Sequence, residues 1–136
     1  MNRFIFTLIA TMILLEGCQS KPVTDETITV AGGSYKNITP DDLNTMFKNK
    51  DFVFINVHIP FIGNIASTDL SIPYDQIEQN LSQLGSDKNA KIVLYCRSGH
   101  MSQIAAEKLV SLGYTNVWNL KGGMVAWEQS GYNIEK

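Results

Sequence analysis

Cysteine is almost absent from the sequence, because Cys18 and Cys96 are the only two among 136 residues. They form no Cys-x-x-Cys pair and no cluster with histidine, so we predict no metal site and no cofactor. An excess of charge of one sign is also missing, since 11 basic residues against 13 acidic ones leave a net charge of −2. This balance gives no sign of a basic surface, and we expect no nucleic-acid partner.

A hydrophobic run long enough to span a bilayer, about 20 residues, is missing as well. The longest apolar run extends from Phe4 to Leu15, follows a basic residue, and is typical of the core of a signal peptide. It leads into Leu15-Glu16-Gly17-Cys18, which resembles a bacterial lipobox. This resemblance implies that Cys18 becomes the lipidated N-terminus. We therefore predict a signal peptide over residues 1–18 and a periplasmic, lipid-anchored protein of the bacterial cell envelope; a plain secretory signal or an uncleaved anchor is the alternative.

The remaining sequence has the composition of one folded domain. The chain is 44% hydrophobic and 18% charged, which suits a single domain with a proper core. Residues 19–33 are small and polar and predict a tether, within which Thr27 to Val30 fit a short edge strand. Residues 34–136 alternate apolar, β-branched runs with helical patterns, which predicts an α/β domain with a mostly parallel sheet.

The segment from Lys91 to Gly113 places Cys96 between a predicted strand and a predicted helix. Ile92 to Tyr95 is a short apolar run typical of a buried strand, and a helix is predicted to open at Ser102. In an open α/β sheet, ligands bind at the carboxyl ends of the strands. The unpaired amides and the dipole of a helix start favour an anion such as a thiolate. We therefore predict a nucleophilic Cys96, and the alternative is a buried, inert thiol.

The scarcity of cysteine strengthens the reactive interpretation. If Cys18 carries lipid, Cys96 has no disulfide partner within the chain. An exported protein meets an oxidising compartment, where a lone thiol indicates reactivity or pairing with another molecule.

Three motifs of this sequence resemble motifs of rhodanese-like domains. The loop Cys-Arg-Ser-Gly-His-Met-Ser begins at Cys96, and the stretch from Asn116 to Trp127 is similar to the closing strand, Gly-Gly pair and Trp of the family. Upstream, Phe52 to His58 is similar to the apolar strand that ends in Asp-Val-Arg in the family. The resemblance covers about residues 34–134 and implies a five-stranded, mostly parallel sheet with helices on both faces.

The resemblance implies a sulfurtransferase with Cys96 as its catalytic residue. The Cys96 thiolate would take a sulfane sulfur from a small anion such as thiosulfate, or from a persulfide donor, and pass it to cyanide or to a thiol of a small molecule or a protein. The positions that resemble the substrate-binding loop are Arg97, Ser98, Gly99, His100, Met101 and Ser102. Many thiosulfate-using members have a basic residue where this chain has Met101.

Asn56 and His58 are predicted to support the site, and they stand where the family has Asp and Arg. Asn56 is able to hold loop amides by hydrogen bonds. His58 fits anion binding, proton supply or, as we favour, a plain polar position at a strand end.

Two alternatives to an enzyme remain open. Asn56, His58 and Ile62 lack the charges that the family has there, which indicates a non-enzymatic sulfane-sulfur carrier or a protein-interaction module. The other alternative is a thiol-redox partner that forms a mixed disulfide through Cys96. Tyrosine-phosphatase chemistry is disfavoured, because it needs Cys-x5-Arg and the sixth residue after Cys96 is Ser102.

Other segments predict structure rather than chemistry. Thr39-Pro40 predicts the start of a helix, and Asp75 to Leu84 predicts another. Phe61 and Ile62 are expected to pack beneath their loop, although a pocket or partner surface is the alternative. Gly122-Gly123 is expected to allow close packing beside the Cys96 loop.

Overall fold

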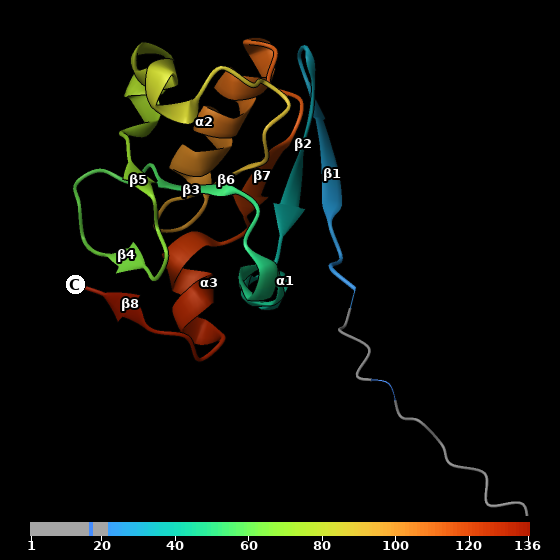
Figure 1. The fold of residues 1–136 in the computed structure, drawn as a ribbon. Helices are drawn as coiled ribbons and strands as arrows, with labels where there is room; N and C mark the ends of the chain where they lie inside the picture. The colour runs from blue at the N-terminus through green and yellow to red at the C-terminus, as the bar shows by residue number, and fades with distance from the viewer. Residues whose placement is uncertain (1–16, 18–21) are drawn as a thin grey trace, which may run out of the picture.

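The computed structural model describes residue 17 and residues 22–136, so Cys18 and most of the predicted signal peptide lie outside the described residues. Figure 1 shows a central sheet flanked by helices. The helices are α1 (Pro40–Met46), α2 (His100–Ser111) and α3 (Gly123–Gln129), with 3-10 segments at Phe47–Asn49, Tyr74–Gln76 and Glu78–Leu84. Among the described residues, no helix combines the length and hydrophobicity needed to cross a bilayer.

The central sheet has six strands within the described part of the chain. Its spatial order is β1-β2-β7-β6-β3-β5. The strands are β1 (Glu26–Val30), β2 (Gly33–Ile38), β7 (Val117–Leu120), β6 (Ile92–Tyr95), β3 (Val53–Asn56) and β5 (Leu70–Ser71). A separate two-stranded sheet pairs β4 (Asn64–Ile65) with β8 (Ile134–Glu135).

The main sheet is parallel except for β1. The pairs β2–β7, β7–β6, β6–β3 and β3–β5 are parallel, and β1 pairs antiparallel with β2. The predicted α/β fold with a mostly parallel sheet is therefore confirmed. The sheet has six strands rather than the five that the family resemblance implied, because Glu26–Val30 adds the edge strand β1. The short edge strand predicted over Thr27 to Val30, within the segment predicted as a tether, is therefore confirmed. All strands except β1 end on the same side, which we call the carboxyl end of the sheet.

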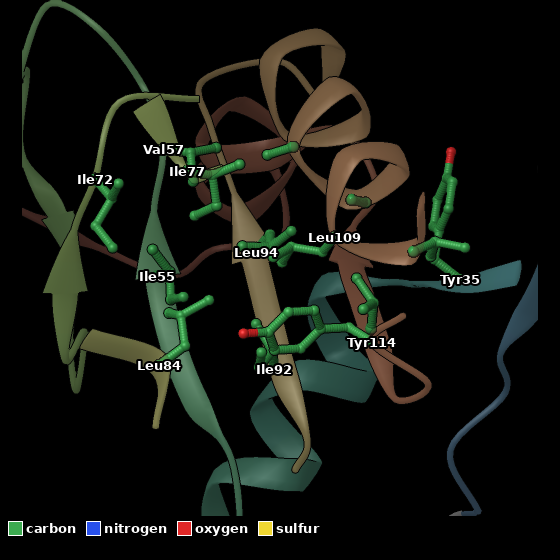
Figure 2. Close-up of a cluster of buried hydrophobic side chains, with 14 of the residues drawn as sticks. Tyr35, Ile55, Val57, Ile72, Ile77, Leu84, Ile92, Leu94, Leu109 and Tyr114 are labelled. Atoms are coloured by element: carbon green, nitrogen blue, oxygen red, sulfur yellow. The ribbon is translucent and has the colours of Figure 1, made fainter. Parts of the chain in front are cut away.

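Two hydrophobic cores lie on opposite faces of the sheet. On one face, Ile55, Val57 and Leu94 pack with Leu109 of α2, as Figure 2 shows. On the other face, Phe54 and Tyr95 pack with residues of α1 and α3. Strands buried on both faces read as continuous apolar runs, which is why β3 and β6 were recognisable in the sequence.

The start of α1 fixes both this helix and the chain that precedes β1. The Thr39 side chain accepts a hydrogen bond from the Asp42 N–H, and the Asp42 carboxylate accepts one from the Thr39 N–H, forming the predicted N-terminal cap. The Thr24 N–H also donates to Asp42 Oδ1, at 3.1 Å. Burial alone would raise the pKa of Asp42, but the hydrogen bonds from Thr24 and Thr39 outweigh it and hold the pKa below its usual value.

Three local predictions were wrong. The predicted helix from Asp75 to Leu84 is a pair of 3-10 segments with a kink at Asn80, because few of its side chains are buried to support a regular helix. Phe61 and Ile62 do not pack beneath their loop but are 62% and 41% exposed. Helix α2 begins at His100, two residues before the predicted start, because Gly99 adopts the left-handed conformation that ends the loop.

Candidate active site

Cys96 follows β6, an internal strand, at the carboxyl end of the sheet. Its Sγ accepts a hydrogen bond from the Gly99 N–H at 3.0 Å and lies 3.4 Å from the Ser102 Oγ. The Ser102 Oγ also donates to the Gly99 carbonyl oxygen at 3.1 Å. Cys96 is only 1% exposed and Ser102 is fully buried. The sulfur therefore lies inside the turn between β6 and α2, with the Gly99 N–H as its donor and the Ser102 hydroxyl oxygen beside it.

The turn depends on the backbone of Gly99. This residue is the N-cap of α2 and has φ of +108°, a conformation that residues with a side chain rarely adopt. The conformation turns the Gly99 N–H towards the sulfur while α2 begins at His100. The first amides of α2 have no acceptor within the helix, so the helix start also directs partial positive charge at the turn.

The start of α3 packs directly against the Cys96 loop, as Gly122-Gly123 predicted. The Cys96 carbonyl accepts a hydrogen bond from the Met124 N–H, and the Arg97 carbonyl accepts one from the Val125 N–H, both at 2.9 Å. A Cβ on Gly123 would overlap the Cys96 carbonyl oxygen and come within 2.7 Å of the Arg97 carbonyl carbon. Only glycine therefore fits between α3 and the loop.

Asn56 holds the loop after β3 beside the Cys96 loop. Its side-chain oxygen accepts a hydrogen bond from the His58 N–H at 3.0 Å, and its amide nitrogen donates to the Gly63 carbonyl at 2.9 Å. The Asn56 side chain therefore holds one backbone amide and one carbonyl of the loop that follows β3. Asn56 of β3 is opposite Tyr95 of β6 in the parallel register. The two segments that follow these residues therefore leave the sheet side by side.

His58 lies near Arg97, where β3 and β6 leave the sheet. Burial lowers the pKa of His58, and the charge of Arg97 lowers it further. Both effects favour the neutral form of the imidazole. Its Nδ1 atom is buried and has no hydrogen-bond partner within the described residues.

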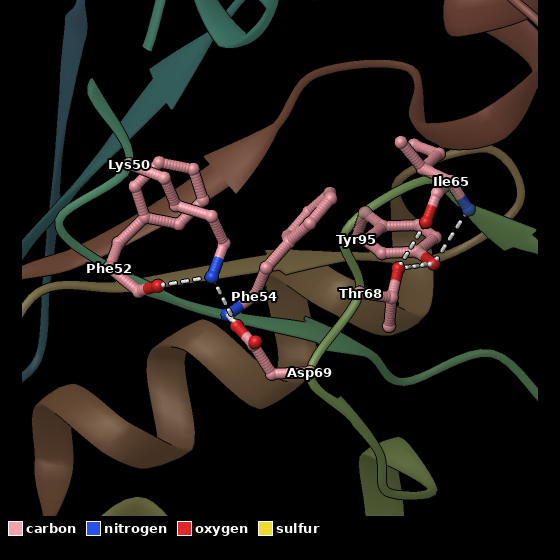
Figure 3. Close-up of polar contacts among 7 residues, drawn as sticks. All are labelled: Lys50, Phe52, Phe54, Ile65, Thr68, Asp69 and Tyr95. Atoms are coloured by element: carbon pink, nitrogen blue, oxygen red, sulfur yellow. Dashed lines mark hydrogen bonds and ion pairs between the residues drawn. The ribbon is translucent and has the colours of Figure 1, made fainter. Parts of the chain in front are cut away.

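Tyr95 is a supporting residue that the sequence analysis counted only as part of a strand. Its hydroxyl oxygen accepts a hydrogen bond from the Ile65 N–H at 3.0 Å and lies 2.7 Å from the Thr68 hydroxyl, as Figure 3 shows. Burial raises the pKa of Tyr95, although these hydrogen bonds oppose the shift. The phenol directly before the cysteine thus ties the β4 region to the strand that carries Cys96. In the sequence, the only indication of this role was a hydroxyl group at the end of an otherwise apolar run.

The predicted site residues fall into two groups. Cys96, Gly99 and Ser102 meet around the sulfur, whereas Arg97, Ser98 and His100 are exposed and Met101 is half-buried. Arg97 is the only arginine of the described residues and takes part in none of their five ion pairs. Its charge is therefore available to an approaching anion. In the part of the chain that the structure describes, no three His, Cys, Asp or Glu side chains gather as metal ligands.

Comparisons with known proteins place this geometry in a family. A family model of the rhodanese-like domain matches residues 39–130. A sulfurtransferase from Allochromatium vinosum is 38% identical over 87 residues, which are 62% of this chain and 79% of that protein. An uncharacterized protein from Synechocystis is 30% identical over 106 residues, 75% of this chain and 58% of the relative. The crystal structure of a rhodanese-like domain protein from Staphylococcus aureus is 30% identical with a TM-score of 0.60, covering 74% of this chain and 98% of the other.

The fold and the cysteine turn define a rhodanese-like domain, and the chain belongs to that family. The resemblance inferred from the three sequence motifs is thereby confirmed. Among the relatives, the protein from Allochromatium vinosum carries the name sulfurtransferase. The chain spans 58% of the length of the relative from Synechocystis.

Proposed function

We propose that this chain is a sulfurtransferase that carries a sulfane sulfur as a persulfide on Cys96. The observation that best supports the proposal is the contact between the Cys96 Sγ and the Gly99 N–H, at the start of α2. A donor fixed in this position stabilises negative charge on sulfur in a place from which water is largely excluded. Cys96 belongs to the hydrophobic core on the α2 face of the sheet, yet its sulfur has a polar hydrogen-bond donor.

The proposed reaction has two displacement steps. In the first, the Cys96 thiolate attacks the outer sulfur of a donor such as thiosulfate. A new S–S bond forms, the S–S bond of thiosulfate breaks, and sulfite leaves with the electron pair. In the second step, cyanide or an acceptor thiolate attacks the terminal sulfur of the persulfide. Thiocyanate or a new persulfide forms, and the Cys96 thiolate is regenerated.

The loop residues have separate roles in this proposal. The Gly99 N–H contacts the Cys96 sulfur and stabilises its anionic forms. The Ser102 hydroxyl, 3.4 Å from the sulfur, adds a second hydrogen bond when its proton turns from the Gly99 carbonyl oxygen to the thiolate. Arg97 and His100 are exposed and attract the anionic donor. Ser98 and Met101 complete the turn, and the uncharged Met101 makes this loop less suited to thiosulfate than a loop with a second cation. Asn56 positions the neighbouring loop and, with it, His58.

The proposal includes the place where the reaction occurs. The lipobox-like segment supports attachment of the chain to a membrane through lipid on Cys18, with the domain in the periplasm of a bacterium. In this setting, the sulfur donor is a small anion or a persulfide, and the acceptor is a thiol. Intact-mass measurement of the chain purified from bacterial membranes tests the lipid directly.

The test of the reaction is thiosulfate:cyanide sulfurtransferase activity of the full chain in detergent, beside the Cys96→Ser variant. We expect turnover that is lost in the variant, with Ser111→Ala, an exposed site on α2, as a matched control that keeps full activity. Donor-treated protein should also gain the mass of one sulfur atom on Cys96. A folded protein that shows neither turnover nor the added sulfur would refute the proposal.

A non-enzymatic carrier is the second candidate, and the burial of Cys96 favours it. With 1% of the residue exposed, the sulfur is poorly accessible to a small donor diffusing from solution. A carrier would acquire one sulfur per cysteine from a persulfide donor but would not turn over thiosulfate with cyanide. Added sulfur on Cys96 without catalytic turnover would therefore identify the carrier.

A further inference from the structure

The residues just before β1 lie at the same end of the sheet as the Cys96 loop. In β1, Glu26 is opposite Asn37, near the carboxyl end of β2. Just before β1, the Thr24 backbone is held by Asp42 in the first turn of α1. Figure 1 shows β1 beginning beside α1, on the side where α3 and β8 also lie. Because β2 and β6 point the same way in the sheet, Thr24 and Cys96 lie at one end of the domain.

The proposed lipid anchor would restrict how far this end can be from the membrane. From Cys18 to Thr24 the chain advances by 24 − 18 = 6 residues, and whatever their conformation these span at most about 20 Å. The strand order places β6 three strand spacings from β1, which is about 14 Å across the sheet. The Cys96 loop is thus near the point where the anchored chain joins the domain.

Exposed apolar side chains are concentrated at this same end. Phe61, Ile62 and Val125 are 62%, 41% and 38% exposed. Phe61 and Ile62 belong to the loop that follows His58, and His58 is near enough to Arg97 for the charge to lower its pKa. Val125 donates its N–H to the Arg97 carbonyl. The fourth exposed large hydrophobic residue of the described part, Ile104, is on the outer side of α2.

We propose that Phe61, Ile62 and Val125 rest on the surface of the bilayer that anchors Cys18, so that the Cys96 loop faces the membrane. Exposed aromatic and aliphatic side chains enter the interface between headgroups and acyl chains, and a nearby cation such as Arg97 suits anionic headgroups. The sulfur donor or acceptor is then a molecule held at that surface. This inference rests on the lipid anchor of the proposed function.

The experiment uses the full chain purified from bacterial membranes and placed in vesicles of phosphatidylethanolamine and phosphatidylglycerol. Phe61→Trp is compared with the matched control Ile104→Trp, and the emission of the native tryptophans is subtracted from both. Lipids brominated on their acyl chains serve as the quencher. Interfacial segments bury their apolar side chains about 5–10 Å deep, so we expect about a twofold loss of the emission added at position 61. The emission added at position 104 should be little affected.

The outcomes separate this inference from the proposed function. Equal quenching at the two positions, in chains whose mass shows lipid on Cys18, would overturn the membrane-facing orientation alone. It would leave Phe61 and Ile62 as a contact for a protein partner. A mass without lipid would overturn both the anchor and this orientation. Sulfur transfer by Cys96 is tested separately, by the sulfurtransferase assay.

Discussion

The substitution Gly99→Ala tests whether the backbone of the cysteine turn carries the chemistry. Gly99 has φ of +108°, and a Cβ built there would lie 3.4 Å from the Gly122 nitrogen. Holding a residue with a side chain in such a conformation costs about 1–3 kcal/mol. If the turn keeps its shape, the variant therefore loses that much stability. If the turn relaxes, the Gly99 N–H moves away from the Cys96 sulfur.

A matched control separates strain from chemistry. Gly85 also has a positive φ, +83°, and a Cβ there would meet nothing within 4 Å. It lies in the turn after the 3-10 segment Glu78–Leu84, beside Tyr114, which follows the far end of α2. Gly85→Ala should therefore cost similar stability without touching the site.

Two assays give the result. Thermal unfolding should show both variants less stable than the wild type, with Tm lower by roughly 4–15 °C. The rate at which the donor forms the Cys96 persulfide should fall about 10- to 100-fold in Gly99→Ala, as when one donor to a developing anion is removed. It should be unchanged in Gly85→Ala at a temperature where both are folded. A wild-type rate in Gly99→Ala would refute the role of this amide.

Three further predictions concern the surroundings of the site. Ser102→Ala removes the hydroxyl 3.4 Å from the sulfur, and persulfide formation should slow about tenfold, the effect of one hydrogen bond to a charged group. Stopped-flow measurement checks this, and a rate within twofold of the wild type contradicts it. Tyr95→Phe leaves the Ile65 N–H without its acceptor, so the free energy of unfolding in urea should fall by about 1–3 kcal/mol; an unchanged value would show that Tyr95 does not hold the β4 region. The lowered pKa of Asp42 means that its charge stabilises the folded state above its unfolded pKa of about 4, and that this contribution is lost as pH falls through the folded pKa. Asp42→Asn should thus be less stable than the wild type by about 1 kcal/mol at pH 7, and urea titrations should show the difference shrinking at acid pH; a difference independent of pH would exclude this carboxylate as the cause.

The sequence by itself determined the elements with strong local signals. Ile92–Tyr95 is a strand as predicted, because a run buried on both faces has few other ways to exclude its apolar side chains from water. Thr39 and Pro40 start α1 because the cap hydrogen bonds and the fixed φ of proline are properties of a few adjacent residues. The cysteine loop and the Gly-Gly pair likewise indicated the family, since both are contiguous motifs.

The tertiary structure alone decided what depends on residues far apart in the chain. The sequence predicted an edge strand over Thr27 to Val30, but its antiparallel pairing with β2 comes from the tertiary structure, as does the exposure of Phe61 and Ile62. The segment after Asp75 has a helical apolar spacing, yet its weak burial leaves it as kinked 3-10 turns. The position of Arg97 near His58, and of the Tyr95 hydroxyl at Ile65, depends on the parallel register of β3 and β6. No local pattern encodes such contacts, because they arise from the packing of separate segments at the carboxyl end of one sheet.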